Sequence, residues 1–203
     1  MANHVSSTLT LHSGSMEVLK WFHGLCDRAI IPEEERPKDS WEYLKPVYEL
    51  FDTWDDTEDR DTRGWWVDNI GAKWCHFIDV GDDSMHFESA WGYPDALFLR
   101  IHQEACKIDP NVVMTIRYDD EMPNFFGSAV YANGEMYDEE YWDSDSYDNL
   151  ELKFYWDEEE EGAEEPEDWE PTYDRLYEIQ DDDISGMLES LAEVREDASD
   201  STD

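Results

Sequence analysis

The chain is 203 residues long and carries 54 acidic against 14 basic residues, a formal net charge of −40, yet 40% of it is hydrophobic and 14% aromatic. This apolar content excludes a wholly disordered protein. The negative charge excludes direct binding to nucleic acid and to anionic membranes, because like charges repel, and it favours a basic protein partner.

The charge is concentrated toward one end of the chain. Residues 138–203 hold 28 of the acids and 3 of the bases. A protein from a salt-loving organism would carry an even acidic coat, so the uneven distribution disfavours that alternative.

Cysteine use and hydropathy indicate a soluble protein of the host cytoplasm. Cys26, Cys75 and Cys106 are odd in number and include no CxxC pair, which is typical of reduced thiols in the cytosol. No apolar run approaches the ~20 residues that a membrane-spanning helix needs, and the N-terminus lacks a signal-peptide pattern.

The first predicted elements are a strand and a helix. Residues 4–13 alternate small or polar with apolar side chains, which predicts a strand. Ser15 can cap a helix whose apolar side chains recur at helical spacing as far as Cys26. Residues 31–63 are rich in acids and interrupted by Pro46, and they are interpreted as an insertion.

Three further strands and a second helix follow. Strands are predicted over residues 64–80 and 84–91, joined by a Gly-Asp-Asp turn, and a helix over residues 94–108. Another strand, over residues 111–121, leads to a hairpin that turns at residues 132–134, Ala-Asn-Gly.

This order predicts an α+β fold of the ferredoxin-like kind. Strand, helix, two strands, helix and strand give a small antiparallel sheet with two helices on one face. We expect this domain to span residues 1–137, including the insertion. Small open sheets often pair, so a homodimer is compatible with the pattern.

The same residues carry a family resemblance. NHVSSTLTL near the N-terminus, WVDNIGAKW in the middle, FESAWGYP before the second helix and FFGSAVYANGE after the last strand resemble the ferredoxin-like domain family named after the plasmid protein YubB. The resemblance covers roughly residues 2–137. It implies the same fold and an origin in a bacteriophage or plasmid, and it implies no catalytic residues.

Residues 138–203 are predicted to form an acidic, aromatic-rich extension. Apolar and charged side chains alternate over residues 150–156, which predicts an extra strand. Asp183 can cap a helix whose apolar stripe covers residues 184–194. Residues 196–203 are expected to be disordered.

No constellation predicts catalysis or a cofactor. Cys75 and His76 with His86 or Cys106 could form a zinc site, but the paired chelating spacing of such sites is missing. Four tryptophans are more typical of a sheet core than of a sugar or base platform: Trp65, Trp66, Trp74 and Trp91.

Two acid-rich stretches begin like calcium-binding loops. The loops that would start at Asp59 and Asp143 have Ile70 and Phe154 where the bidentate glutamate belongs. Both stretches therefore fail as calcium sites, and no metal is expected.

The acids themselves remain as the candidate site. Carboxylates lie ~6.6–6.8 Å apart at i and i+2 on a strand and ~6 Å apart at i and i+4 on a helix, which resembles phosphate spacing along a nucleic-acid backbone. Asp138 with Glu140, and Asp143 with Asp145, fit the strand geometry, and nearby aromatic rings would add apolar anchors. The predicted partner-binding residues are Asp138, Glu139, Glu140, Asp143, Asp145, Asp157, Glu158, Glu159, Glu160, Glu161, Glu164, Glu165, Asp168 and Trp169.

The favoured hypothesis is a non-catalytic inhibitor encoded by a phage or plasmid. It would mimic DNA or RNA and block the basic nucleic-acid-binding surface of a host defence protein. The alternative is a structural or assembly protein that docks through its acidic arm. The acids could also have no partner and form a solvated face that keeps the protein soluble. A third hypothesis, a hydrolase with a carboxylate metal site, would be tested first at Asp119, Asp120 and Glu121.

Overall fold

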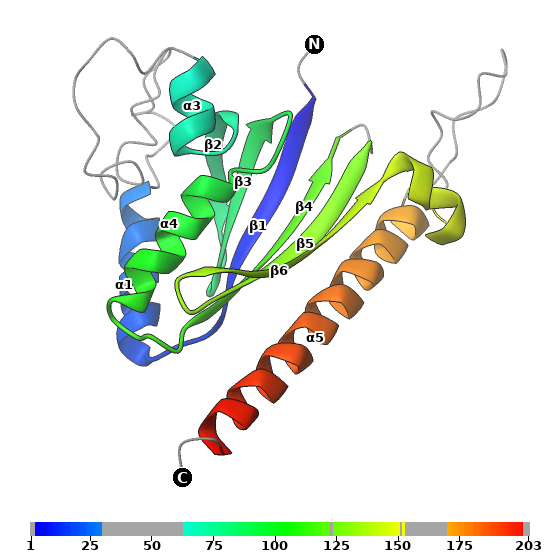
Figure 1. The fold of residues 1–203 in the computed structure, drawn as a ribbon. Helices are drawn as coiled ribbons and strands as arrows, with labels where there is room; N and C mark the ends of the chain where they lie inside the picture. Colours follow the sequence, from blue (N-terminus) through cyan, green and yellow to red (C-terminus); the bar gives the residue numbers. More distant parts are fainter. Residues whose placement is uncertain (1–2, 30–62, 122–123, 151, 153–169, 201–203) are drawn as a thin grey trace, which may run out of the picture.

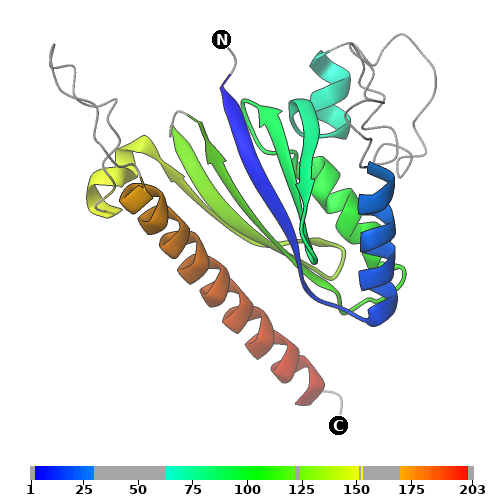
Figure 2. The ribbon, with the colours of Figure 1, turned by 180° about the vertical axis from the view of Figure 1, so that it is seen from behind.

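The protein has an α+β architecture built on one antiparallel sheet. The computed structural model describes residues 3–29, 63–121, 124–150, 152 and 170–200. Within them, six strands are arranged in the order β2-β3-β1-β4-β5-β6, and helices cover both faces of the sheet (Figures 1 and 2). Every neighbouring pair of strands is antiparallel, as the α+β prediction requires.

The bounds of the elements follow the predicted order, with some differences. The strands are β1 (His4–Ser13), β2 (Lys73–Val80), β3 (Ser84–Ala90), β4 (Val113–Asp120), β5 (Phe125–Ala132) and β6 (Glu135–Asp143). The helices are α1 (Met16–Ala29), α3 (Arg63–Asn69), α4 (Asp95–Cys106) and α5 (Glu170–Asp200), and η4 (Ser144–Leu150) is a short 3-10 helix.

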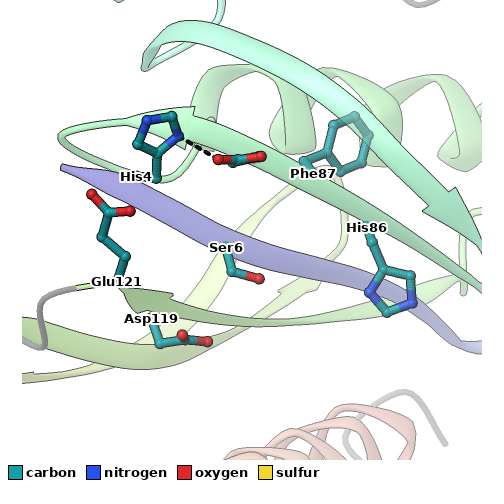
Figure 3. Close-up of a pocket in the computed structure, with 7 residues that line it drawn as sticks. His4, Ser6, His86, Phe87, Asp119 and Glu121 are labelled. Carbon is teal, nitrogen blue, oxygen red and sulfur yellow. Dashed lines mark ion pairs between the residues drawn. The ribbon is translucent and has the colours of Figure 1, made fainter. Parts of the chain in front are cut away.

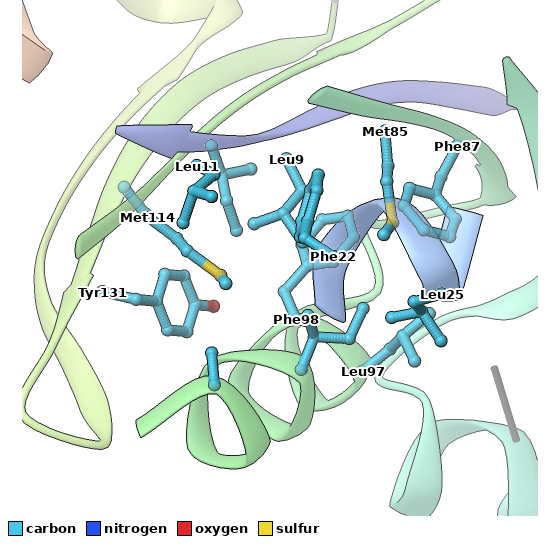
Figure 4. Packing of buried hydrophobic residues seen from close by; sticks show 14 of the residues in the cluster. Leu9, Leu11, Phe22, Leu25, Met85, Phe87, Leu97, Phe98, Met114 and Tyr131 are labelled. Atoms are coloured by element: carbon cyan, nitrogen blue, oxygen red, sulfur yellow. The ribbon is translucent and has the colours of Figure 1, made fainter. Parts of the chain in front are cut away.

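The main core lies between the sheet and the layer formed by α1, α3 and α4 (Figures 1 and 4). α1 begins as predicted, because the Ser15 hydroxyl accepts the backbone N–H of Val18 at 3.4 Å. Phe22 of α1 and Phe98 of α4 are fully buried against strand residues such as Leu9. The alternation in β1 and the helical stripes thus meet in one cluster.

The predicted hairpin joins β5 to β6. Asn133 and Gly134 have φ angles of 56° and 84°. Positive φ at both central residues is the geometry of the two-residue turn that matches strand twist, and Asn-Gly is its preferred sequence.

Residues 64–72 differ from the predicted strand. They form α3 and its exit, and β2 begins only at Lys73. Trp66 and Ile70 lie four residues apart and are both buried in the main core. This is the spacing of a helix, but the apolar residues between them make it look like a strand in the sequence. Gly71 ends the helix with a φ of 93°, and its N–H donates to the Trp66 carbonyl at 3.1 Å, a cap that glycine adopts without strain.

The C-terminal extension also differs in part. α5 contains the predicted helix over residues 184–194 but extends from Glu170 to Asp200, so the disorder predicted from residue 196 is wrong as far as residue 200. Leu150 ends η4, and most of the predicted strand over residues 150–156 lies outside the described residues. Residues 31–62 of the predicted insertion lie outside them as well.

An apolar stripe docks α5 on the opposite face of the sheet from α1 and α4 (Figure 2). The buried amide of Gln180 lies in this contact and donates to the carbonyl oxygens of Tyr118 at 3.0 Å and Gly127 at 2.7 Å. The stripe consists of Leu176, Ile179, Ile184, Met187 and Leu191.

The expected boundary between residues 137 and 138 falls inside β6. β6 pairs along its length with β5, and α5 packs on β4 and β5. The extension therefore shares the sheet and a core with the residues that precede it.

Two glycines provide stability tests of opposite sign. A Cβ at Gly127 would lie 2.4 Å from both the Glu140 carbonyl oxygen and the Tyr118 hydroxyl. Gly127→Ala should therefore lower the free energy of unfolding by about 2–3 kcal/mol. A Cβ at Gly186, inside α5, meets nothing within 4 Å, and Gly186→Ala should raise that free energy by about 0.5–1 kcal/mol. Urea denaturation measures both shifts, and a destabilised Gly186→Ala variant would contradict the open position of this residue.

Candidate functional site

Five of the predicted partner-binding residues lie in the described part of the chain. Asp138, Glu139, Glu140 and Asp143 belong to β6, and Asp145 belongs to η4. The remaining ones lie outside the described residues: Asp157, Glu158, Glu159, Glu160, Glu161, Glu164, Glu165, Asp168 and Trp169.

β6 directs successive carboxylates to opposite faces of the sheet. Asp138 and Glu140 are exposed on the side of α5, where burial and then the charges of Asp183 and Asp138 raise the pKa of Glu140. Their spacing is the strand spacing that the sequence predicts. Asp143 ends β6 and Asp145 lies in a 3-10 helix, so this second pair lacks that spacing.

Glu139 has a structural role instead of an exposed one. Its Oε1 atom accepts hydrogen bonds from the hydroxyls of Tyr93 and Tyr118, each at 2.8 Å. The two tyrosine rings stack at 4.1 Å between centroids, and burial, with the neighbouring carboxylate, raises the pKa of both phenols. Glu139 therefore anchors β6 to the layer of α4, and a partner on the α5 side does not reach it.

α5 contributes more exposed carboxylates than the sequence prediction assigned to it. Its 31 residues hold eleven acids and two bases. Arg175 pairs with Glu178 at 3.1 Å, and Arg195 donates to Asn133 at 3.5 Å. Six exposed acids follow each other at four-residue steps in two groups of three: Asp174, Glu178, Asp182 and Glu189, Glu193, Asp197.

We call the exposed acids of β6 and α5 the acidic flank. The spacing signal for α5 was present in the sequence, but the predicted helix began too late to include its first group. The members of the acidic flank are Glu135, Asp138, Glu140, Asp143, Asp174, Glu178, Asp181, Asp182, Glu189, Glu193, Glu196 and Asp197.

The charge density of the acidic flank can be compared with that of DNA. A 31-residue helix is about 46 Å long, so α5 carries one net negative charge per about 5 Å. β6 has five acids and no base in nine residues, or one charge per about 6 Å. A DNA strand carries one charge per ~3.4 Å. Neither element reaches that density alone, but side by side the two carry one charge per about 3 Å, slightly more than a single DNA strand.

A second surface lies on the part of the sheet that α5 leaves uncovered. A groove of about 530 Å³ opens there over β3, β1 and β4 (Figure 3). Among the described residues it holds three carboxylates and two imidazoles, and no described lysine or arginine lines it. Its lining residues are His4, Ser6, His86, Phe87, Glu88, Asp119 and Glu121.

The strand register arranges the groove in transverse rows. Ser6 of β1 pairs with Asp119 of β4 on one side and with Glu88 of β3 on the other. We call this the serine row. Glu88 also forms an ion pair with His4, which fixes the carboxylate on the β3 side (Figure 3).

Asp119 is the most perturbed carboxyl in the groove. Burial, and then the charge of Asp120, raise its pKa to about 6. Among the described residues, its carboxylate has no hydrogen-bond or ion-pair partner. Arg117, on the same face, pairs instead with Asp181 of α5.

The three acids predicted as a hydrolase site at the end of β4 do not lie on the same face of the sheet. Asp119 and Glu121 line the groove, whereas Asp120 is buried on the opposite face and accepts hydrogen bonds from Asn3 at 3.2 Å and Asn124 at 2.6 Å. No group of three His, Cys, Asp or Glu in the described residues is arranged to hold a metal ion.

Two imidazole pairs were further candidates for catalysis. The His4–Glu88 pair is the acid–imidazole half of a triad, but within the described residues no hydroxyl or thiol bonds to His4. Cys106 lies 3.4 Å from Nε2 of His102, and burial raises the pKa of this thiol and lowers that of His102 to about 4. Both groups are therefore neutral at pH 7, and no thiolate nucleophile forms.

Among the side chains that the structure describes, the predicted aromatic and zinc residues do not form a site together; that of His76 lies outside them. Cys75 and Trp66 are buried in the main core. Trp91 is 49% exposed, with Nζ of Lys73 5.7 Å from its ring centroid. The side chains of Trp65 and Trp74 lie outside the described part.

Comparison with known proteins gives no relative: no family model, no curated protein and no solved structure matches the chain. The family resemblance of residues 2–137 therefore stays a prediction. Among the described helices, none combines the length and apolar character that crossing a bilayer demands.

The unpaired carboxylate of Asp119 should lower stability at neutral pH. Its pKa is about 6 in the folded protein against 3.8 for an ordinary aspartate, so the folded state loses stability as pH rises from about 3.8 to 6, and the loss is complete above that range. Asp119→Asn should raise the free energy of unfolding by about 1–3 kcal/mol at pH 7.5 and by about half as much at pH 5.

Chemical denaturation at both pH values measures this gain. Asp197→Asn is the matched control, since Asp197 is exposed on α5 and its removal should change stability by less than about 0.5 kcal/mol. A loss of stability in Asp119→Asn at pH 7.5 would show that the carboxylate has a stabilising partner.

Proposed function

We propose that this chain is a non-catalytic binding protein of a phage or plasmid, which presents its acidic flank to the basic, nucleic-acid-binding surface of a host protein. The observation that carries this proposal is the series of exposed carboxylates at four-residue steps along α5, beside those of β6. A defence nuclease has the kind of basic cleft that such a surface fits. Opposite charge also speeds association by electrostatic steering.

Aromatic side chains next to the acidic flank support the proposal. Trp142 donates to Asp183 at 2.9 Å, and the hydroxyls of Tyr137 and Ser190 lie 3.1 Å apart, so these two rings tie β6 to α5. Tyr177 of α5 is 43% exposed. It supplies an apolar anchor that charge alone lacks.

We assign the fold around β1–β4 to the ferredoxin-like class as part of the same proposal. The strand order β2-β3-β1-β4, with α1 and α4 on one face, supports this assignment. The resemblance to the YubB-type domain then supports an origin in a mobile element and a site of action in the host cytoplasm.

A second candidate function is that of an assembly protein that docks through its acidic arm. It is favoured by the position of β6, which is the outermost strand of the described sheet on that side. Such a protein would bind another component of its own element and leave host nucleic-acid-binding proteins untouched.

Charge reversal on α5 tests the first function. Glu189→Lys with Glu193→Lys removes two exposed acids of the acidic flank, and capture of the basic host protein from lysate should fall at least tenfold. Raising NaCl from 50 to 300 mM should release that protein from the unaltered chain, because salt screens the contact. Quantitative mass spectrometry of the captured fraction, with duplex DNA as a competitor, measures both effects.

The matched control reverses two exposed acids of the helical layer on the other face, Glu17→Lys with Asp68→Lys. This variant has the same net charge and should retain capture. Equal loss in both variants, or capture that neither salt nor DNA reduces, would contradict nucleic-acid mimicry and favour the assembly function.

A further inference from the structure

The two carboxylates of the serine row are separated by a gap. The small residue Ser6 lies at the bottom of this gap. Adjacent strands lie ~4.8 Å apart, so the Cα atoms of Asp119 and Glu88 are about 9.5 Å apart, with Ser6 midway. All three side chains line the groove, and Glu121 and His4 close the adjacent end of it (Figure 3). An ionised carboxylate is only an acceptor, and among the described residues His4 pairs with Glu88 whereas no group pairs with Asp119, so Asp119 can accept a donor from outside.

We propose that the groove over the serine row binds the guanidinium group of an arginine side chain of the basic partner. The inference rests on the proposed function and adds a defined contact to the diffuse charge of the acidic flank. A planar guanidinium carries five N–H donors in a fixed fork, enough to engage Asp119, Glu88 and the Ser6 hydroxyl together.

The geometry favours this extended cation over a metal ion. Oxygen ligands of calcium and magnesium lie 2.0–2.6 Å from the ion, which requires several carboxylates to converge on one point. The described residues contain no such convergence, and the two carboxylates of the serine row start on strands that are not neighbours. An anionic ligand is excluded by the three carboxylates of the lining.

The unsatisfied state of Asp119 provides an independent reason. The Asp119 side chain is half-buried and has no hydrogen-bond or ion-pair partner among the described residues, although Arg117 lies two positions away on the same face. Arg117 is held by Asp181 and so does not fill the groove. An incoming guanidinium would neutralise Asp119 without displacing an existing ion pair of that residue.

Position also supports a partner side chain as the source. The groove and α5 lie on the same face of the sheet (Figure 3). Asp119 is close enough to Tyr173 and Tyr177 of α5 that its charge, after burial, raises the pKa of both phenols. A protein that lies along the acidic flank can therefore extend an arginine into the groove.

The test uses the full chain and N-acetyl-arginine amide as the probe. Two-dimensional NMR at 150 mM NaCl should show saturable shifts at the amides of Ser6 and Glu88 and at the imidazole of His86. N-acetyl-citrulline amide has the same shape without the charge and should give no shift. N-acetyl-lysine amide, which lacks the planar fork, should bind more weakly. Asp119→Asn should weaken arginine binding at least fivefold, and the control Asp197→Asn should leave it unchanged.

Three outcomes would overturn the inference. If Asp119→Asn binds the arginine probe as well as the unaltered chain does, the Asp119 carboxylate is not part of the site. Equal binding of the lysine or citrulline probe would remove the guanidinium as the recognised group. Shifts that rise without saturation over the whole acidic flank would show loose condensation of cations.

The result of this test can be distinguished from a failure of the proposed function. The variant with Glu189→Lys and Glu193→Lys should lose the host protein but keep arginine binding in the groove. A chain that captures its partner in a salt-dependent manner but gives no saturable arginine shift would overturn this inference alone. If the chain binds the arginine probe but captures no basic protein, the proposed function is wrong, and so is the inference that the arginine comes from a basic partner.

Discussion

The docking of α5 on β4 and β5 is the contact on which both candidate surfaces depend. Gln180 fixes its position, because the buried amide donates to one carbonyl on each of these two strands. The helix then presents one side to solvent as most of the acidic flank, while its Tyr173 and Tyr177 lie near Asp119 of the groove. Without this contact the four-residue steps of acids would have no fixed orientation, and Asp119 would lose its neighbours Tyr173 and Tyr177.

Apolar burial outweighs the repulsion that this arrangement creates. Each buried apolar side chain of α5 contributes about 1.5–3 kcal/mol as an upper estimate, whereas each pair of like charges at i and i+4 costs about 0.2–0.5 kcal/mol. Salt at physiological strength screens exposed charges beyond ~8 Å. The five apolar residues of the stripe thus hold the helix on the sheet with its acids exposed: Leu176, Ile179, Ile184, Met187 and Leu191.

Local patterns in the sequence predicted the elements that depend on neighbouring residues. The cap at Ser15, the Asn133-Gly134 turn and the stripe of α5 from residue 184 are of this kind. Gly71 was missed as a helix terminator because the apolar run around it fits a strand as well. The serine row could not be predicted, since it depends on the register of three strands that are far apart in the sequence. Glu139 was misjudged for the same reason, because its tyrosine partners come from other elements.

The position of β6 at the end of the described sheet has a consequence for self-association. An outermost strand offers main-chain donors and acceptors to any other strand, which makes it the usual starting point of aggregation. β6 carries five acids in nine residues, so a second copy of this chain that approaches edge to edge meets a matching row of like charge. The same charge that would attract a basic host protein thus serves as a gatekeeper, and a strand added at this edge must itself be basic.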